Sequence, residues 1–187
     1  PRDAFKIDGR MAFWFGDDKS QDEKIRSLFS EDIEKASSGE LDHWADTPRG
    51  RLALIILLDQ FRRNIFRRSK DAYIMDHQVL KLTIKGMELG HDRQLEPIER
   101  AFFYMPMQHS ESLKVQDFSV RTFTTLAETV KPTLRATFGT FSQFAELHRD
   151  IVAQFNRFPH RNEALGRKNT PEEEAYLDES PPDFGQT

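Results

Sequence analysis

Cysteine is absent from this chain of 187 residues. Its absence excludes disulfides, thiolate metal sites and a cysteine nucleophile, and it fits a reducing compartment, for which the cytoplasm is the default. Long hydrophobic runs are absent too, because the longest, Leu52 to Leu58, is far shorter than the roughly 20 residues that span a bilayer. At Pro1 the chain shows no basic segment followed by an apolar one. We therefore expect a cytoplasmic protein without a membrane helix or a signal segment.

An excess of basic charge is also lacking. Lys and Arg number 27 against 31 Asp and Glu, which gives a formal net charge of -4 and a pI near 5.9. Such a balance offers no general attraction to nucleic acid or anionic lipid. The aromatic runs Phe13-Trp14-Phe15 and Phe102-Phe103-Tyr104 have no basic strip beside them, so we interpret them as core anchors. The Gly-rich patterns of nucleotide-binding loops are missing as well. We predict no nucleic-acid partner.

Spacings typical of metal sites do not occur, and His-Glu-x-x-His is among the missing patterns. On a helix, residues two apart such as His148 and Asp150 point about 200° from each other, so they cannot readily hold the same ion. The sequence thus predicts no metal and no cofactor. Possible ligand atoms are nevertheless carried by His109, Glu111, His148, Asp150 and His160.

Aromatic residues are plentiful, with 16 Phe, two Trp and three Tyr. Each buried ring removes about 150 to 250 Å² from water, so we expect an aromatic-rich core. A length of 187 residues suits one domain. We place a single all-α domain at residues 1–179 and a flexible tail at 180–187, where proline, glycine and polar residues dominate.

Apolar residues recur at helical spacing almost throughout, and no segment alternates like a strand. Start and stop signals then divide the chain, among them a cap at Ser20, Gly39 after the first helix, Pro48 at a helix start and Pro159 after the longest helix. We expect an all-α fold of about eight to nine helices packed as antiparallel hairpins. The clearest are expected at 20–36, 48–58, 70–89, 96–104 (broken by Pro106), 111–130 (capped by Ser110), 133–155 and from Pro171 onward.

Three polar clusters stand at the ends of apolar helical segments: 59–64, 109–111, and 148–150 together with 158–162. Polar groups are costly to bury unpaired, so these clusters form a candidate site. Asp59 and Arg63 are four residues apart and can pair on one helical face. Either they cap and fasten the end of a buried helix, or Asp59 orients Arg63 or Arg67 toward an anion.

Histidines leave a similar choice open. His148 lies on an apolar helical stripe, where a histidine is more often a satisfied core residue than a ligand. His109 and His160 stand beside helix ends, where the fold can bring them to His148, and a histidine held there can act as a general acid or base. Glu111 can orient such a histidine, or it can favour the dipole of the helix that follows it.

Several motifs in one order make the chain resemble an uncharacterised bacterial family, domain of unknown function 924. The family is grouped with tetratricopeptide-like helical folds, so the resemblance implies a right-handed array of α-hairpins, and it implies no activity. Two positions depart from the pattern: Arg62 replaces an expected proline, so the helix can run past Phe61, and Ala12 replaces a common acid. The motifs are Phe13-Trp14-Phe15-Gly16, Thr47 to Leu54, Leu58 to Phe61, Arg63 to Arg67, His109-Ser110-Glu111, His148 to Ile151, Arg157 to Asn162 and Thr170 to Glu174.

Two function classes follow. We favour a binding protein that holds a small anionic metabolite or a peptide in a polar pocket between helices. The alternative is a hydrolase- or lyase-type enzyme in which His148 or His109 exchanges protons, Asp59 or Glu111 orients it, and an arginine clamps the substrate. A closed pocket at His148 favours a small ligand or an enzyme, whereas an open groove favours a peptide. The candidate ligand-binding residues are Arg63, Asn64, Arg67, His109, His148, His160, Arg161 and Asn162.

Overall fold

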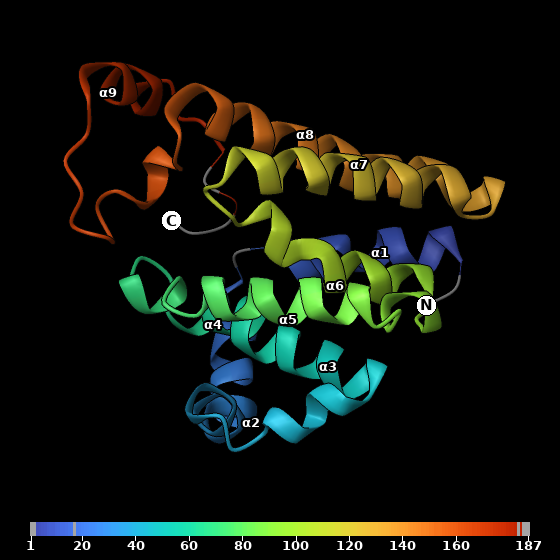
Figure 1. The fold of residues 1–187 in the computed structure, drawn as a ribbon. Helices are drawn as coiled ribbons and strands as arrows, with labels where there is room; N and C mark the ends of the chain where they lie inside the picture. Colours follow the sequence, from blue (N-terminus) through green and yellow to red (C-terminus); the bar gives the residue numbers. More distant parts are fainter. Residues whose placement is uncertain (1–2, 17, 183, 185–187) are drawn as a thin grey trace.

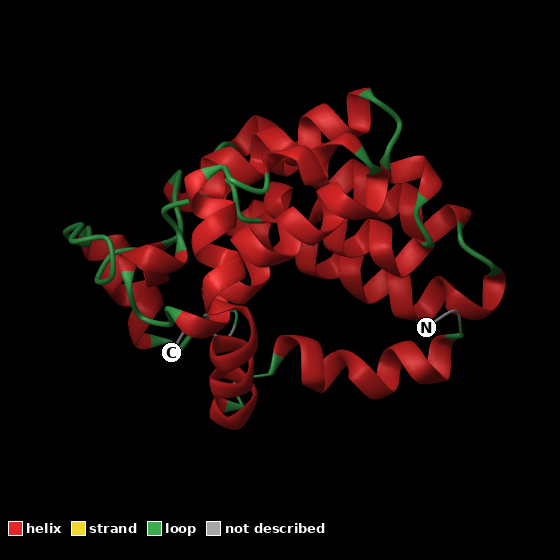
Figure 2. Cartoon of the chain, turned by 90° about the horizontal axis from the view of Figure 1, so that it is seen from below, coloured by secondary structure: helices red, strands yellow, loops and turns green. Residues whose placement is uncertain are grey.

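The structure is a computed structural model that describes residues 3–16, 18–182 and 184. Over these residues the chain contains only helices and loops (Figure 2), which confirms the all-α prediction. The α-helices are α1 Ala4–Phe15, α2 Lys19–Ser38, α3 Pro48–Ile55, α4 Arg62–Ile65, α5 Asp76–Glu88, α6 Pro97–Gln108, α7 Leu113–Thr129, α8 Arg135–Phe155 and α9 Pro171–Asp178. Short 3-10 helices are η1 Asp42–Asp46, η3 Lys70–Ala72, η4 Asp92–Gln94, η5 Pro132–Leu134 and η6 Pro159–Arg161, and η2 Ile56–Phe61 is a π-helix.

Helices α7 and α8 lie side by side and run in opposite directions along the top of Figure 1, and α5 and α6 form a second antiparallel pair beneath them. The expected antiparallel hairpins are therefore present. Helix α2 is seen end-on in the same view, so it runs across these pairs. The tetratricopeptide-like stacking that the resemblance implies stays a prediction.

Local signals explain several helix ends. The Thr47 side chain accepts a hydrogen bond from the Gly50 backbone and Pro48 occupies the first position of α3. Helix α2 ends at Gly39, whose φ of 86° suits a glycine. Its first cap differs from the prediction, because Asp18 rather than Ser20 caps the helix.

Four other expectations were wrong. Pro106 does not break α6, since a proline near the end of a buried helix forfeits only one backbone hydrogen bond. Helix α5 begins at Asp76 rather than near 70, behind the 3-10 turn η3, and Ser112 rather than Ser110 stands at the cap position of α7. Helix α1 was not foreseen. In it, Phe13 is 58% exposed and so is no core anchor.

The core forms two clusters of unequal size. The main cluster draws on every helix from α1 to α8, and the second contains only Ile151, Val152 and Phe158 as buried members, with Tyr176 and Phe184 packed against them. The core was expected to be aromatic-rich rather than aliphatic, but Ile, Leu and Val side chains outnumber the rings among its buried members. None of the described helices combines the length and apolar character that crossing a membrane requires. Of the predicted tail, residues 183 and 185–187 lie outside the described residues, and its flexibility stays a prediction.

Candidate functional site

A π-helical segment places the central carboxylate. Helices α3, η2 and α4 follow one another without a break from Pro48 to Ile65, so the helix runs past Phe61 at Arg62, as expected. Asp59 lies inside the π segment and is only 1% exposed. Single π turns inside α-helices are rare and are frequent at functional sites.

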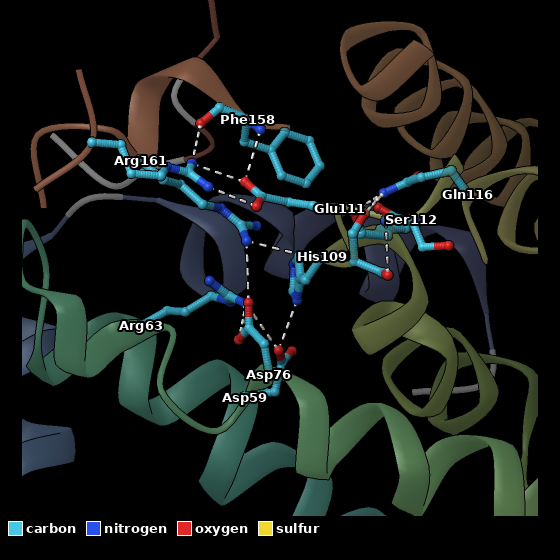
Figure 3. A network of polar contacts seen from close by, with 12 residues as sticks. Asp59, Arg63, Asp76, His109, Glu111, Ser112, Gln116, Phe158 and Arg161 are labelled. Carbon is cyan, nitrogen blue, oxygen red and sulfur yellow. Dashed lines mark hydrogen bonds and ion pairs between the residues drawn. The ribbon is translucent and has the colours of Figure 1, made fainter. Parts of the chain in front are cut away.

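Asp59 is the hub of a hydrogen-bonded network that spans three helices (Figure 3). His109 Nδ1 lies 2.7 Å from Asp59 Oδ1, and Gln60 donates to Oδ2 at 2.6 Å. Arg63 Nη2 lies 3.3 Å from Asp59 Oδ1 and 2.6 Å from Asp76 Oδ1. The predicted Asp59–Arg63 pair therefore exists, but the shorter ion pair of Arg63 is with Asp76.

Arg161 joins the third cluster to this network. Its Nη1 donates to Asp76 Oδ2 at 3.1 Å and to the His109 carbonyl at 3.0 Å. Its guanidinium also lies 4.3 Å from the ring centroid of Phe158. Sequence reasoning missed Asp76, because a helix expected to begin near residue 70 gave that aspartate no special place.

The network fixes the charges of its members. Burial by itself would raise the pKa of Asp59, but His109 and Arg63 outweigh it and hold that pKa well below its usual range. Burial and the charge of Arg63 together lower the pKa of His109, against the pull of Asp59. At neutral pH His109 is thus uncharged. Its Nδ1–H donates to the Asp59 carboxylate, and its Nε2 carries the lone pair.

His148 is a second neutral histidine. Its Nδ1 donates to the Phe144 carbonyl at 2.7 Å, and its ring centroid lies 6.1 Å from that of His109. Burial, with a smaller contribution from His109, lowers its pKa well below the usual value. The ring of Phe184 stacks on it at 3.8 Å. Two neutral imidazoles, one from α8 and one at the end of α6, therefore lie close together.

Both histidines line a cavity of about 360 Å³. Arg67, another lining residue, contacts Asp22 through Nε at 2.5 Å and Nη2 at 2.9 Å. Among the residues that the structure describes, no carboxylate lines the cavity, and Asp22, Asp59 and Asp76, which pair with its arginines, are not lining residues. The lining comprises Met11, Trp14, Phe15, Gly16, Gln60, Arg63, Asn64, Arg67, Met105, Gln108, His109, Phe141, Phe144, His148 and Phe184.

One donor of this lining is unsatisfied. Arg63 is 8% exposed, and its Nε is buried without a hydrogen-bond partner. A buried donor left unpaired costs about 1 to 3 kcal/mol, and more when it is charged.

Five predicted residues do not line the cavity: Asp59 and Arg161, described above, and Glu111, Asn162 and His160. Glu111 accepts from the Phe158 backbone at 2.9 Å and pairs with Arg167 at 2.7 Å, so Asp59 and not Glu111 is the carboxylate on His109. Asn162 donates to Asn169 and Glu173. His160 packs against Phe158 and Phe184. Together with Arg161 these residues fasten the chain segment that follows α8.

Several side chains at this site are of the types that bind metal ions. Over residues 3–16, 18–182 and 184, no three His, Asp or Glu side chains gather closely enough to hold a metal ion.

The fold and this site define a class: an all-α protein with a buried His–Asp–Arg network beside a cavity. The chain belongs to the family described as "Bacterial protein of unknown function (DUF924)", which matches residues 5–181. The predicted family is thus confirmed. The chain is also similar to a solved structure, "Structure of Protein of Unknown Function ATU0120 from Agrobacterium tumefaciens", at 34% identity and a TM-score of 0.80, covering 94% of this chain and 97% of that one. No curated protein matches.

Proposed function

We propose that this protein binds a small anionic molecule in the cavity beside His109 and His148. One observation carries the proposal: Arg63 and Arg67 line the cavity, while the carboxylates that neutralise them stand outside its lining. An anion in the cavity therefore meets guanidinium groups directly, and these offer planar forks of donors to carboxylate or phosphate.

Size supports a small ligand rather than a peptide. A cavity of about 360 Å³ falls within the range of roughly 300 to 1,000 Å³ that small-molecule sites occupy. Apolar rings such as Trp14, Phe141 and Phe144 make up much of the wall. The favoured ligand is thus a metabolite with one acidic group and an apolar body.

Calorimetric titration with acetate, hexanoate, succinate and phosphate tests the proposal. Arg67→Gln should weaken the tightest anion at least about tenfold, since a hydrogen bond to a charged group contributes about 1.5 to 3 kcal/mol. Arg149→Gln is the matched control, because Arg149 is on the exposed side of α8 and pairs only with Asp117 and Asp150. Equal binding by Arg67→Gln and the wild type, or no binding of any anion, would contradict the proposal.

Proton-transfer catalysis is a second candidate, and the Asp59–His109 pair favours it. Asp59 orients Nδ1–H and leaves Nε2 as a base, and both arginines can stabilise the negative charge that develops when a carbon next to a carboxylate loses its proton. The lining contains no Ser, Thr, Cys, Tyr or Lys, so a covalent intermediate on these side chains is not favoured.

Deuterium exchange distinguishes the two candidates. A bound carboxylic acid incubated with the protein in D2O should exchange its α-hydrogen if His109 abstracts it, and NMR detects the loss of that signal. His109→Gln should abolish the exchange while it keeps binding within a few fold. Binding without any exchange would leave the protein a binding protein.

A further inference from the structure

A second cavity, of about 570 Å³, lies beside the first and is mainly apolar. Exposed Leu28 and Phe13 form part of its wall, together with the buried Ile25, Leu52 and Ile98. Four charged residues line this cavity, the acids Glu96 and Glu99 and the bases Lys24 and Arg49. Their charges balance, so the lining does not attract an anion. The lining comprises Phe13, Trp14, Gln21, Lys24, Ile25, Leu28, Phe29, Arg49, Leu52, Ile56, Gln60, Phe61, Asn64, Glu96, Ile98, Glu99 and Phe102.

Three residues line both cavities: Trp14, Gln60 and Asn64. Gln60 and Asn64 are four residues apart and so are neighbours on one face of the η2–α4 helix. Trp14 comes from α1 on the other side. The two cavities therefore adjoin at these three residues, whose side chains have rotamers to move.

The lining residues that α6 contributes change from apolar to polar along the two cavities. On α6 the stripe Ile98, Phe102, Met105 and His109 advances by three and four residues, with Ile98 in the apolar cavity and His109 in the polar one. His109 lies eleven positions after Ile98, which corresponds to about 16 Å along a helix. The path is thus long enough for an extended molecule.

The continuous helix α3–η2–α4 and the turn that follows it show the same change from apolar to polar lining residues. Leu52 and Ile56 belong to the apolar cavity, and Arg63 and Arg67 belong to the polar one. Since both helices change character in the same direction, one end of the combined path suits a hydrocarbon and the other end suits an anion.

Helix α1 covers this path and is held mainly by rings. Trp14 packs edge-on against Phe102 at 5.2 Å, and Phe15 stacks on Phe102 at 5.7 Å. Asp8 accepts a hydrogen bond from Thr137 on α8 at 2.8 Å. Trp14 contacts Phe102 and, with Gln60 and Asn64, lines both cavities, so a ligand that passes between the cavities has to displace these side chains.

We propose that the two cavities form one channel under α1 that binds an alkyl carboxylate of medium length. The carboxylate lies at Arg63 and Arg67, and the chain passes Trp14 into the apolar cavity. The inference rests on the proposed function because it uses the same anion site, and it adds the class of ligand.

A series of acetate, hexanoate, octanoate and decanoate tests the channel by calorimetry, with each acid kept below its micelle-forming concentration. Affinity should rise about fourfold for each added methylene, which is about 0.8 kcal/mol, until the path is filled. Leu28→Glu places a charge on the wall of the apolar cavity at a 60% exposed position, so folding is spared. It should remove most of the gain for decanoate and leave acetate unchanged.

Ile74→Glu is the matched control, because Ile74 is 64% exposed and lines neither cavity. In a Trp44→Phe background Trp14 is the only tryptophan. Its emission should shift on addition of decanoate and not of acetate.

The outcomes separate the two proposals. Affinity that does not depend on chain length, with Arg67 still required, would overturn the channel and leave the anion site standing. A gain with chain length that Leu28→Glu does not reduce would also overturn it. Failure of every acid to bind would remove both the channel and the proposed function.

Discussion

The main body of the protein and its C-terminal region, residues 147–184, are held together differently. The main core has buried side chains from Ile7 to Ala145, with rings such as Phe103 and Phe138 fully enclosed. Among the described residues of the C-terminal region, the hydrophobic cluster has Ile151, Val152 and Phe158 as its buried members. A small cluster of this kind buries too little apolar surface to order a long segment by itself.

Ion pairs supply the remaining stabilisation of the C-terminal region. Arg157 contacts both carboxylate oxygens of Glu173 at 2.6 Å, and Arg167 contacts both oxygens of Glu111 at 2.7 and 2.9 Å. Such bidentate pairs are strong and directional. The stability of the main body therefore comes from the burial of apolar side chains. The stability of the C-terminal region depends more on well-oriented arginine–carboxylate pairs, which require ionised carboxylates.

The candidate site lies where the two regions meet. His148 and Phe184 belong to the C-terminal region, and Asp59 and His109 belong to the main body. Arg161 crosses the boundary to Asp76 and to the His109 carbonyl. A ligand in the cavity therefore contacts both regions at once.

Truncation of the main core should have the largest effect. Phe138 is fully buried, and Phe138→Ala should lower the free energy of unfolding by about 3 to 5 kcal/mol through lost burial and a new cavity. Urea unfolding followed by circular dichroism measures it. Phe118→Ala, at a 38% exposed position on α7, should cost less than half as much. Equal losses of stability in the two variants would contradict the expectation that a buried ring stabilises the fold more than an exposed one.

Removal of one charge in the C-terminal region should have a smaller and more local effect. Glu173 is 2% exposed, and Arg157 lowers its pKa to about 2. Glu173→Gln should cost about 2 to 3 kcal/mol, because a buried charge-assisted pair is lost. Hydrogen exchange should speed up in the C-terminal region and stay unchanged in α5 and α6.

The matched control is Glu172→Gln, one residue earlier in α9 and exposed. Because the folded pKa of Glu173 lies below the unfolded value of 4.5, its stabilisation is present above pH 4.5 and is lost as the pH falls toward 2. Uniform acceleration across all helices in Glu173→Gln would show that the two regions unfold as one.

The smallest expected effect is a pH slope from the histidines at the boundary. Both His109 and His148 have folded pKa values below the ordinary 6.5, so the unfolded chain takes up protons first as the pH falls. Stability should therefore decrease below pH about 6.5, by up to about 1.4 kcal/mol per pH unit for each histidine. His148→Leu should reduce the slope between pH 6.5 and 5, measured by urea midpoints.

Exposed His43 provides the control for that slope. His43→Gln should retain the wild-type slope over the same pH range. A slope that His148→Leu leaves untouched would mean that His148 accepts a proton in the folded protein, contrary to its neutral assignment.

Much of the fold was predictable because its signals are local. Pro48 behind the Thr47 cap, Gly39 and the Thr170–Glu173 capping box mark ends that the backbone requires wherever the helix packs. One failure concerns context. Whether Pro106 breaks a helix depends on what surrounds it. Helix α1 carries an apolar stripe, Ile7, Met11 and Trp14, at spacings of four and three residues, and this signal was missed.

The sequence indicated several residues of the site but not most of the contacts between them. A pair four residues apart, Asp59 and Arg63, can be read from the sequence. The dominant partner of Arg63 is Asp76, thirteen residues away on another helix, and the partner of Asp59 is His109, fifty residues away. The sequence marks no such pairing, because side chains meet across helices according to how the helices pack.

The sequence by itself determined the all-α class and several helix ends, because periodicity and caps act within a few residues. Only the tertiary structure decided that His109, His148, Arg63 and Arg67 face one cavity while Glu111 and Asn162 fasten the C-terminal region. The physical reason is that burial and pairing of charges depend on distances in space, and packing alone sets those distances.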